Sequence, residues 1–135
     1  MKILECSTHG DKRFSALYAK VSVYGVYDTI ENHYQKCKRD AFGNPVKKGC
    51  RPNHIIVNNK KLDIKYLTPY YKSLWVKYLD QNKDLVDFLK NYDDFSDKFK
   101  GKNTVNCQAD VIRQYIKNGR ESIINECIDF FNQIR

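Results

Sequence analysis

The chain has 135 residues, of which 41% are hydrophobic, so residues 1–135 are long enough for a single domain with a buried core. Its formal net charge of +8 favours anionic partners such as nucleotides, phosphates or nucleic acid. No apolar run approaches the roughly 18 residues that cross a membrane. The first six residues are too few and too acidic for a signal peptide, so we expect a cytoplasmic protein without a membrane partner.

The cysteines predict neither a metal site nor a redox dithiol. The chain has five, they are widely spaced, and no two of them form a C-x-x-C pair. Reduced thiols are expected in the cytoplasm, and no cofactor is predicted.

The first 27 residues indicate strands. Ile3 and Leu4 begin a short apolar stretch, and residues 18–24 alternate with small and β-branched side chains on one side. Gly25 then permits a turn that leads toward a helix.

Residues 28–39 are predicted to form that helix, and it is the most informative stretch of the chain. Offsets of three, four and seven residues share one face of a helix, which aligns four polar side chains. They are Glu31, Tyr34, Gln35 and Lys38. Asp28 followed by Glu31 also resembles a capping box, with Asp28 as the cap. On spacing alone, a solvated helix face with a capping glutamate is favoured over a binding site.

The middle of the chain is predicted to be a loop followed by a hairpin. Glycines, prolines and lysines between residues 40 and 52 indicate an exposed basic loop. Short apolar runs flank Asn58 and Asn59, and asparagine tolerates positive φ. We therefore expect a hairpin near 55–64 that projects from the body.

The second half of the chain is predicted to be mostly helical. Apolar residues at helical spacing indicate helices at 67–79, from 84, at about 105–117 and at about 121–134. Asn118 and Gly119 are a strong stop for the third of these. The fold class is therefore α+β, a mainly helical single domain around a small β-sheet.

The polar segment at 91–102 ends in Gly101-Lys102-Asn103, just before a predicted helix. The start of a helix offers free N–H groups to an anion, so this position is a candidate phosphate site. The alternative is an ordinary loop in which Asn103 or Asn106 caps the helix, and this motif by itself favours that alternative.

Four stretches resemble, in order, motifs of the NADAR family: residues 12–19, 29–38, 77–85 and 101–113. The second resembles the family's T-x-E-H-x-x-Q-x-x-K signature, with Glu31, Gln35 and Lys38 in register. The fourth resembles G-K-N-x-L-G-x-x-L-M-x-x-R, which ends at Arg113. The family includes N-glycosidases of early riboflavin-pathway intermediates and hydrolases that remove ADP-ribose from guanine bases.

The chain departs from the family pattern at several points. Ala16 stands where the family has asparagine, and Asn106 replaces a glycine. The family's D-x-x-x-W-G is shortened, with Asp94 and Phe99 or Phe95 as its nearest counterparts. The loop and hairpin at 40–65 replace a region that is usually helical. The resemblance implies the same pocket with a ligand that need not be the same.

The resemblance implies an N-glycosidase that cleaves a ribose C–N bond in an ADP-ribose-type or modified nucleotide. Glu31 would stabilise an oxocarbenium-like transition state or protonate the leaving nitrogen. Lys38 would attack the opened sugar as a neutral amine and form a Schiff base. This role requires a lowered pKa for Lys38, through burial or a neighbouring cation such as Lys36 or Arg39.

The resemblance also implies the ligand-binding residues. Tyr34 and Gln35 would orient the sugar or base, and Phe99 or Phe95 would stack on the base. Phosphate would contact Lys102, Asn103 and the fork of Arg113. For Arg113 the alternative is a surface ion pair with Asp110 or Glu121. The remaining candidates are Ser15 and Asp94.

Two other functions compete with this one. A catalytically altered NADAR-like binder would sequester an NAD-derived signalling nucleotide, as the change to Ala16 suggests. A basic nucleic-acid-binding module would rest on charge and aromatic residues alone. The expected partners are a nucleotide or ADP-ribosylated base and a nucleic acid carrying that base. The sequence does not indicate an oligomeric state.

Overall fold

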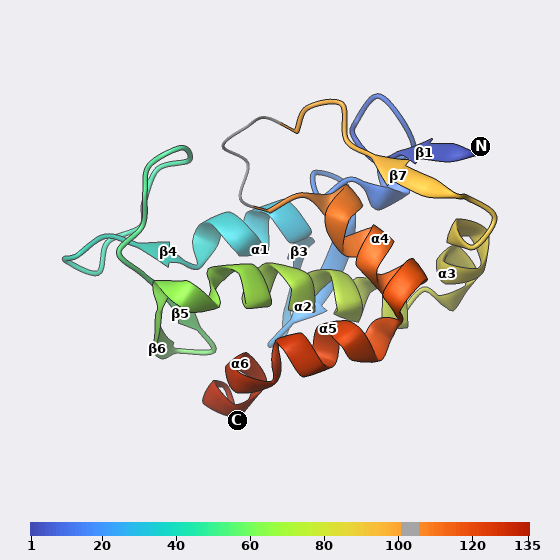
Figure 1. The fold of residues 1–135 in the computed structure, drawn as a ribbon. Coiled ribbons are helices and arrows are strands. Elements are labelled where there is room, and N and C mark those ends of the chain that lie inside the picture. The colour runs from blue at the N-terminus through green and yellow to red at the C-terminus, as the bar shows by residue number, and fades with distance from the viewer. Residues whose placement is uncertain (101–105) are drawn as a thin grey trace.

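The computed structural model describes residues 1–100 and 106–135 (Figure 1). Its strands are β1 (Ile3–Glu5), β2 (Lys20–Val23), β3 (Val26–Thr29), β4 (Lys38–Arg39), β5 (His54–Val57), β6 (Lys60–Asp63) and β7 (Asp94–Ser96). Its α-helices are α1 (Ile30–Lys36), α2 (Leu67–Asp80), α3 (Lys83–Leu89), α4 (Gln108–Asn118), α5 (Arg120–Glu126) and α6 (Ile128–Gln133). Two 3₁₀ turns lie at Lys12–Phe14 and Ile64–Tyr66. The predicted α+β class is confirmed.

Helix α2 is the centre of the fold and contacts α1, α3, α4, α5 and β2 (Figure 1). Its apolar residues recur at helical spacing, and Pro69 occupies the first turn, where a missing N–H costs nothing. Trp75 and Leu79 are fully buried, and the Trp75 ring meets Tyr78 edge-on at 5.5 Å. The helix predicted at 67–79 is confirmed.

In the described residues the strands form three small sheets, where the sequence predicted one. β1 pairs in parallel with β7, β2 forms a hairpin with β3, and β4, β5 and β6 form an antiparallel sheet. The parallel pair brings residues 3–5 beside residues 94–96, which are far away in sequence (Figure 1).

The predicted hairpin near 55–64 is present as β5 and β6. Asn58 and Asn59 have φ of 51° and 62°, as a two-residue type I′ turn requires. Its inner face is buried, however, because Ile55, Val57 and Leu62 pack into the core and β4 adds a third strand. The exposed segment at this end of the molecule is the loop at 40–52, and the hairpin is part of the body.

The last predicted helix is broken into α5 and α6 at Cys127. The bend brings Phe130 into the core, where its ring lies 6.2 Å from the ring of Tyr66 and 5.9 Å from that of Tyr70. Gly119, with φ of 90°, ends α4 where the sequence predicted a stop. Among the described residues, no helix combines the length and apolar character needed to cross a bilayer.

Candidate functional site

A cleft of about 820 Å³ lies on the side of α1 that faces the 48–52 loop. Its walls come from segments far apart in sequence: residues 7–8, 15–17, α1 with β4, the loop at 48–52, the start of α2, residues 97–99 and residues 106–108. A volume of this size suits a nucleotide-sized ligand. Of the sequence candidates, the cleft is lined by Ser15, Glu31, Tyr34, Gln35, Lys38 and Phe99.

The turn after β1 positions Ser7 and Thr8 at the cleft. Gly10 donates its N–H to the Ser7 carbonyl at 2.9 Å, and a Cβ on Gly10 would lie 2.0 Å from the Glu5 carbonyl oxygen. The turn therefore requires glycine. Glu5 joins this turn to the opposite wall, because its carboxylate accepts hydrogen bonds from the Ser7 and Lys98 amides and from the Ser96 hydroxyl.

Helix α1 begins at Ile30, within the predicted range 28–39, and its cap is Thr29 rather than Asp28. The Thr29 hydroxyl accepts from the Asn32 amide at 3.1 Å. Asp28 instead accepts hydrogen bonds from the Thr29 amide, the Asn32 side chain and the Lys36 ammonium. Glu31 is therefore not a capping residue, and its carboxylate lines the cleft.

Lys38 reaches the cleft from β4, since α1 ends at Lys36. The predicted helical stripe is therefore wrong at its last member. Buried Cys37 ends the helix, and the chain then pairs Lys38 with Ile55 of β5. Lys38 lies beside the helical residues because this strand continues along the same wall.

The Lys38 ammonium is partly buried, with Nζ 4.3 Å from the ring centre of Tyr34. Burial lowers the pKa of Lys38, the charge of Lys48 lowers it further, and Cys37 and Glu31 oppose the shift. The two cations suggested by sequence lie elsewhere. Lys36 pairs with Asp28 at 2.7 Å, and the Arg39 guanidinium donates to the backbone carbonyls of Lys36 and Lys38.

Glu31 is held by two neighbours. Its Oε1 accepts a hydrogen bond from Gln35 Nε2 at 2.9 Å and lies 3.6 Å from Lys48 Nζ. The Gln35 Oε1 is buried without a hydrogen-bond partner in the described part of the chain. An unsatisfied buried acceptor costs roughly 1–3 kcal/mol, so a hydroxyl or amine of a ligand would find a ready partner there.

Tyr34 contributes a buried phenol to the cleft wall. Its hydroxyl accepts from Asn106 Nδ2 at 2.8 Å, and its ring meets Tyr71 edge-on at 5.0 Å. Burial raises the pKa of Tyr34, so the phenol keeps its proton and can donate it to a ligand oxygen.

The backbone of Ala16 connects the two main walls. Its N–H donates to Gln108 Oε1 at 3.0 Å, and its carbonyl accepts from the Glu31 amide at 3.0 Å. Gln108 in turn donates to Asp97 at 2.7 Å. Gln108 and Asp97 were not predicted from sequence, and nothing in their spacing identifies them. Lys48 and Arg51 were not predicted as cleft residues either, although both lie in the predicted basic loop.

Asp94 and Arg113 do not line the cleft. Arg113 Nε contacts Asp94 Oδ1 at 2.7 Å and Nη1 contacts Asp110 Oδ1 at 2.9 Å, while Nη2 donates to the Phe95 carbonyl. These contacts join β7 to α4 and favour the ion-pair alternative for Arg113 over a phosphate contact. Lys102 and Asn103 lie outside the described residues.

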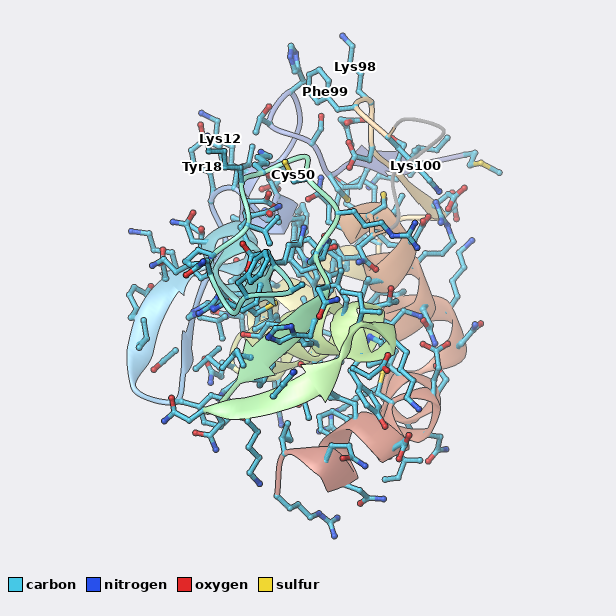
Figure 2. The ribbon with its side chains drawn as sticks, turned by 90° about the vertical axis from the view of Figure 1, so that its left-hand side faces the viewer. Lys12, Tyr18, Cys50, Lys98, Phe99 and Lys100 are labelled. Carbon is cyan, nitrogen blue, oxygen red and sulfur yellow. The ribbon has the colours of Figure 1, made fainter. Side chains whose placement is uncertain are left out.

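The two candidate stacking residues differ in how far they are exposed. Phe95 is 1% exposed and belongs to the core, whereas Phe99 is 61% exposed and lines the cleft. The Phe99 ring lies 4.9 Å from that of His9. Figure 2 shows Phe99 and Lys98 extending outward at one end, with Tyr18 and the loop carrying Cys50 on the same side of the molecule.

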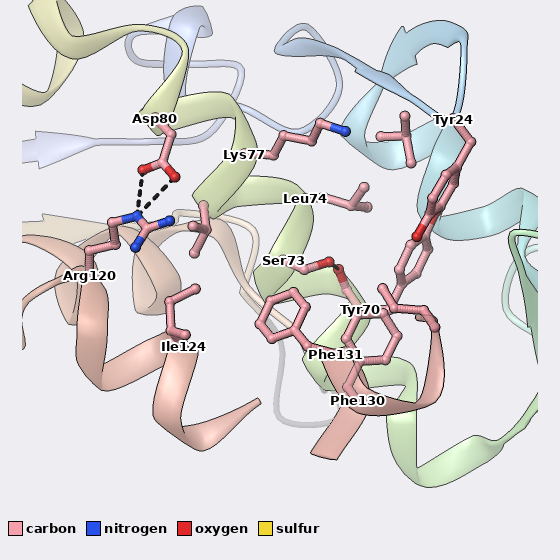
Figure 3. Close-up of a pocket in the computed structure, with 13 residues that line it drawn as sticks. Tyr24, Tyr70, Ser73, Leu74, Lys77, Asp80, Arg120, Ile124, Phe130 and Phe131 are labelled. Carbon is pink, nitrogen blue, oxygen red and sulfur yellow. Dashed lines mark hydrogen bonds and ion pairs between the residues drawn. The ribbon is translucent and has the colours of Figure 1, made fainter. Parts of the chain in front are cut away.

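A second, smaller cavity of about 260 Å³ shares no lining residue with the cleft. It lies between the other face of α2 and helices α5 and α6, and aromatic rings of Tyr24, Tyr70, Phe130 and Phe131 form much of its wall (Figure 3). At one end Asp80 accepts from Arg120 Nε at 2.9 Å.

The fold and the cleft define an α+β domain with a carboxylate, an amine and a phenol in one hollow. Residues 25–134 match the family model described as the DarT1-associated NADAR antitoxin, and the chain therefore belongs to the NADAR family. The first stretch of resemblance, residues 12–19, precedes the matched range. A search of curated proteins found no match.

Proposed function

We propose that this protein is an N-glycosidase that cleaves the C–N bond between ribose and a base in an ADP-ribosylated or similarly modified nucleotide. The observation that carries the proposal is that Glu31 and Lys38 line the same cleft. They approach it from a helix and from the strand that follows, with the Lys38 amine partly withdrawn from solvent.

The two residues divide the reaction between them. Glu31 takes a proton from the Lys38 ammonium and passes it to the leaving nitrogen, which departs with the electron pair of the C–N bond. The neutral Lys38 amine bonds to C1 in its place. The C1–O4 ring bond then breaks with an amine proton going to O4, and water hydrolyses the resulting protonated Schiff base to return the ammonium and release the sugar aldehyde. Burial of the Lys38 ammonium increases the neutral fraction that this attack requires.

The family description supports a base in nucleic acid as the substrate. An antitoxin would act by removing ADP-ribose from a modified base, as the family resemblance implies for guanine. Exposed Phe99 and Tyr18 offer aromatic faces near the cleft, and Lys12 Nζ lies 4.9 Å from the ring centre of Tyr18 (Figure 2). Aromatic residues of this kind stack on bases, typically for about 1–3 kcal/mol each.

The decisive experiment follows a synthetic ADP-ribosylated guanosine, free and within a short DNA strand, by mass spectrometry. We expect release of the unmodified base with the wild-type protein and none with Lys38→Ala. Borohydride added during turnover should leave a reduced sugar adduct on the peptide containing Lys38. Intact substrate after prolonged incubation would refute the proposal.

A second candidate is a binder that retains the cleft without catalysis. It is favoured by Ala16, which supplies only backbone contacts where the family has an asparagine side chain. Tight stoichiometric binding with the ligand recovered intact would establish this alternative. A nucleic-acid-binding module would instead bind unmodified oligonucleotides, with affinity that falls steeply as salt rises.

A further inference from the structure

The residues on either side of the loop at 47–52 form hydrogen bonds with β4, the strand that carries Lys38. Before the loop, the Val46 amide donates to the Lys38 carbonyl at 3.4 Å. After it, the Asn53 amide donates to the Arg39 carbonyl at 2.8 Å. The loop therefore begins and ends beside the strand that carries the candidate nucleophile, and both line the cleft.

A tight turn gives this loop its shape. The Cys50 amide donates to the Lys47 carbonyl at 3.0 Å, and Gly49 has φ of 89°, as the third position of a type II turn requires. Lys48 occupies the second position of this turn. Residues 48–52 all line the cleft, so the turn directs its side chains toward the ligand space.

The loop is strongly positive. Residues 47–52 contain Lys47, Lys48 and Arg51 and no acidic residue. Within the described part of the chain, Arg51 makes no ion pair, and Lys48 has only the long 3.6 Å contact with Glu31. The Lys48 side chain is 73% exposed, and ion pairs that open to solvent contribute little, so Lys48 can exchange Glu31 for a stronger anion.

We infer that the loop at 47–52 is the diphosphate-binding element of the cleft, with Lys48 and Arg51 contacting the phosphates. This inference rests on the proposed function for the identity of the ligand. Binding moves Lys48 from the Glu31 carboxylate to a phosphate oxygen. Glu31 is thereby released to act at the C–N bond only when a diphosphate is present.

Arg51 supplies the planar fork that suits phosphate. Arg113 does not supply this contact, because it is paired with Asp94 and Asp110.

The test measures binding rather than turnover, by titration calorimetry with ADP-ribose, ADP, pyrophosphate and adenosine. The variant Lys48→Met/Arg51→Met should bind ADP-ribose and ADP about a hundredfold more weakly, because charged contacts to phosphate are lost. Its affinity for adenosine should stay within about twofold of the wild type, since adenosine has no phosphate. The control Lys61→Met/Lys83→Met removes the same charge from exposed positions outside the loop that do not line the cleft, and should bind all four ligands normally.

A second variant tests the exchange itself. Glu31→Gln leaves Lys48 without an ion pair to give up, so ADP should bind up to about fivefold more tightly. Weaker binding of ADP by Glu31→Gln would overturn the exchange.

Three results would overturn the diphosphate assignment: unchanged ADP binding by the Lys48/Arg51 variant, an equal loss in the control, or no binding of ADP or pyrophosphate by the wild type. Wild-type protein that binds ADP as described but never releases a base would refute the glycosidase proposal and leave this assignment intact.

Discussion

The two cavities lie against different faces of α2 and differ in what their polar groups do. In the cleft, Lys38 is partly buried, Glu31 has a long and exposed ionic contact with Lys48, and the Gln35 carbonyl oxygen lacks a partner in the described residues. In the smaller cavity, the carboxylate of Asp80 is already paired with Arg120 (Figure 3).

The difference separates groups available for chemistry from groups already occupied by a protein partner. Polar side chains with weak or missing partners lose little when a ligand replaces those partners. Asp80 already has a partner in Arg120 and therefore has less to offer a ligand. The cleft is therefore the candidate reaction site, and the smaller cavity is an imperfectly filled part of the packing between α2 and the C-terminal helices.

The largest difference between the two cavities is expected when the carboxylate residue of each, Glu31 or Asp80, is replaced with the matching amide. Glu31→Gln should lower the turnover of ADP-ribosylated guanosine roughly a hundredfold to ten-thousandfold, because a proton donor is lost. Asp80→Asn should leave turnover within about twofold and cost less than about 1 kcal/mol of stability, because its ion pair with Arg120 is partly exposed. Base release by chromatography and thermal unfolding measure both. Equal losses of turnover would contradict the assignment.

Removing one phenylalanine from each region should give opposite results. Phe130→Ala should lower the free energy of unfolding by about 3–5 kcal/mol, since its ring is buried against two tyrosines. Phe99→Ala should change stability by less than about 0.5 kcal/mol, because its ring is exposed.

For ligand binding the order should reverse. Phe99→Ala should weaken binding of the modified nucleoside by about fivefold or more through lost stacking, whereas Phe130→Ala should not weaken it. Urea unfolding and calorimetry provide the two readouts. Normal nucleoside binding by Phe99→Ala would remove Phe99 from the site.

Lowering the pH should destabilise the wall of the cleft around Glu5 before it destabilises helix α2. Burial acts to raise the pKa of Glu5, but hydrogen bonds from Ser7, Lys98 and Ser96 outweigh it and lower the pKa from 4.5 to about 2. Because the folded pKa lies below the unfolded one, Glu5 stabilises the fold fully above about pH 4.5, and this contribution is lost as pH falls toward 2.

Hydrogen exchange should therefore show the Lys98 and Ser7 amides losing protection across that window, ahead of amides in α2. The variant Glu5→Gln should show weaker protection there at neutral pH and no such pH dependence. Simultaneous loss of protection in both regions would contradict a local effect.

The smallest expected effect concerns thiol reactivity. Cys50 is exposed and lines the cleft, whereas the other four cysteines are buried, and burial raises the pKa of Cys6 and Cys37 to about 12. Iodoacetamide should therefore modify native protein at Cys50 alone, and saturating ADP-ribose should slow this reaction severalfold. An unchanged rate would show that the ligand does not reach the loop at 47–52.

Local patterns predicted several elements correctly because local chemistry determines them. The apolar spacing of α2, the asparagine pair between β5 and β6, and the stop at Gly119 each depend on residues close in sequence. The break at Cys127 was missed, because it depends on where the Phe130 ring finds space against Tyr66 and Tyr70. The end of α1 was also missed, because Lys38 joins a strand whose partner comes later in the chain.

The sequence by itself determined the family, the fold class and the set of polar side chains around Glu31. It did so because signature spacing and hydrophobic periodicity are properties of short stretches. Only the tertiary structure decided which cations face the ligand. It engages Arg113 with Asp94 and places Lys48 and Arg51 at the cleft, because contacts between distant segments form only when the whole core has packed.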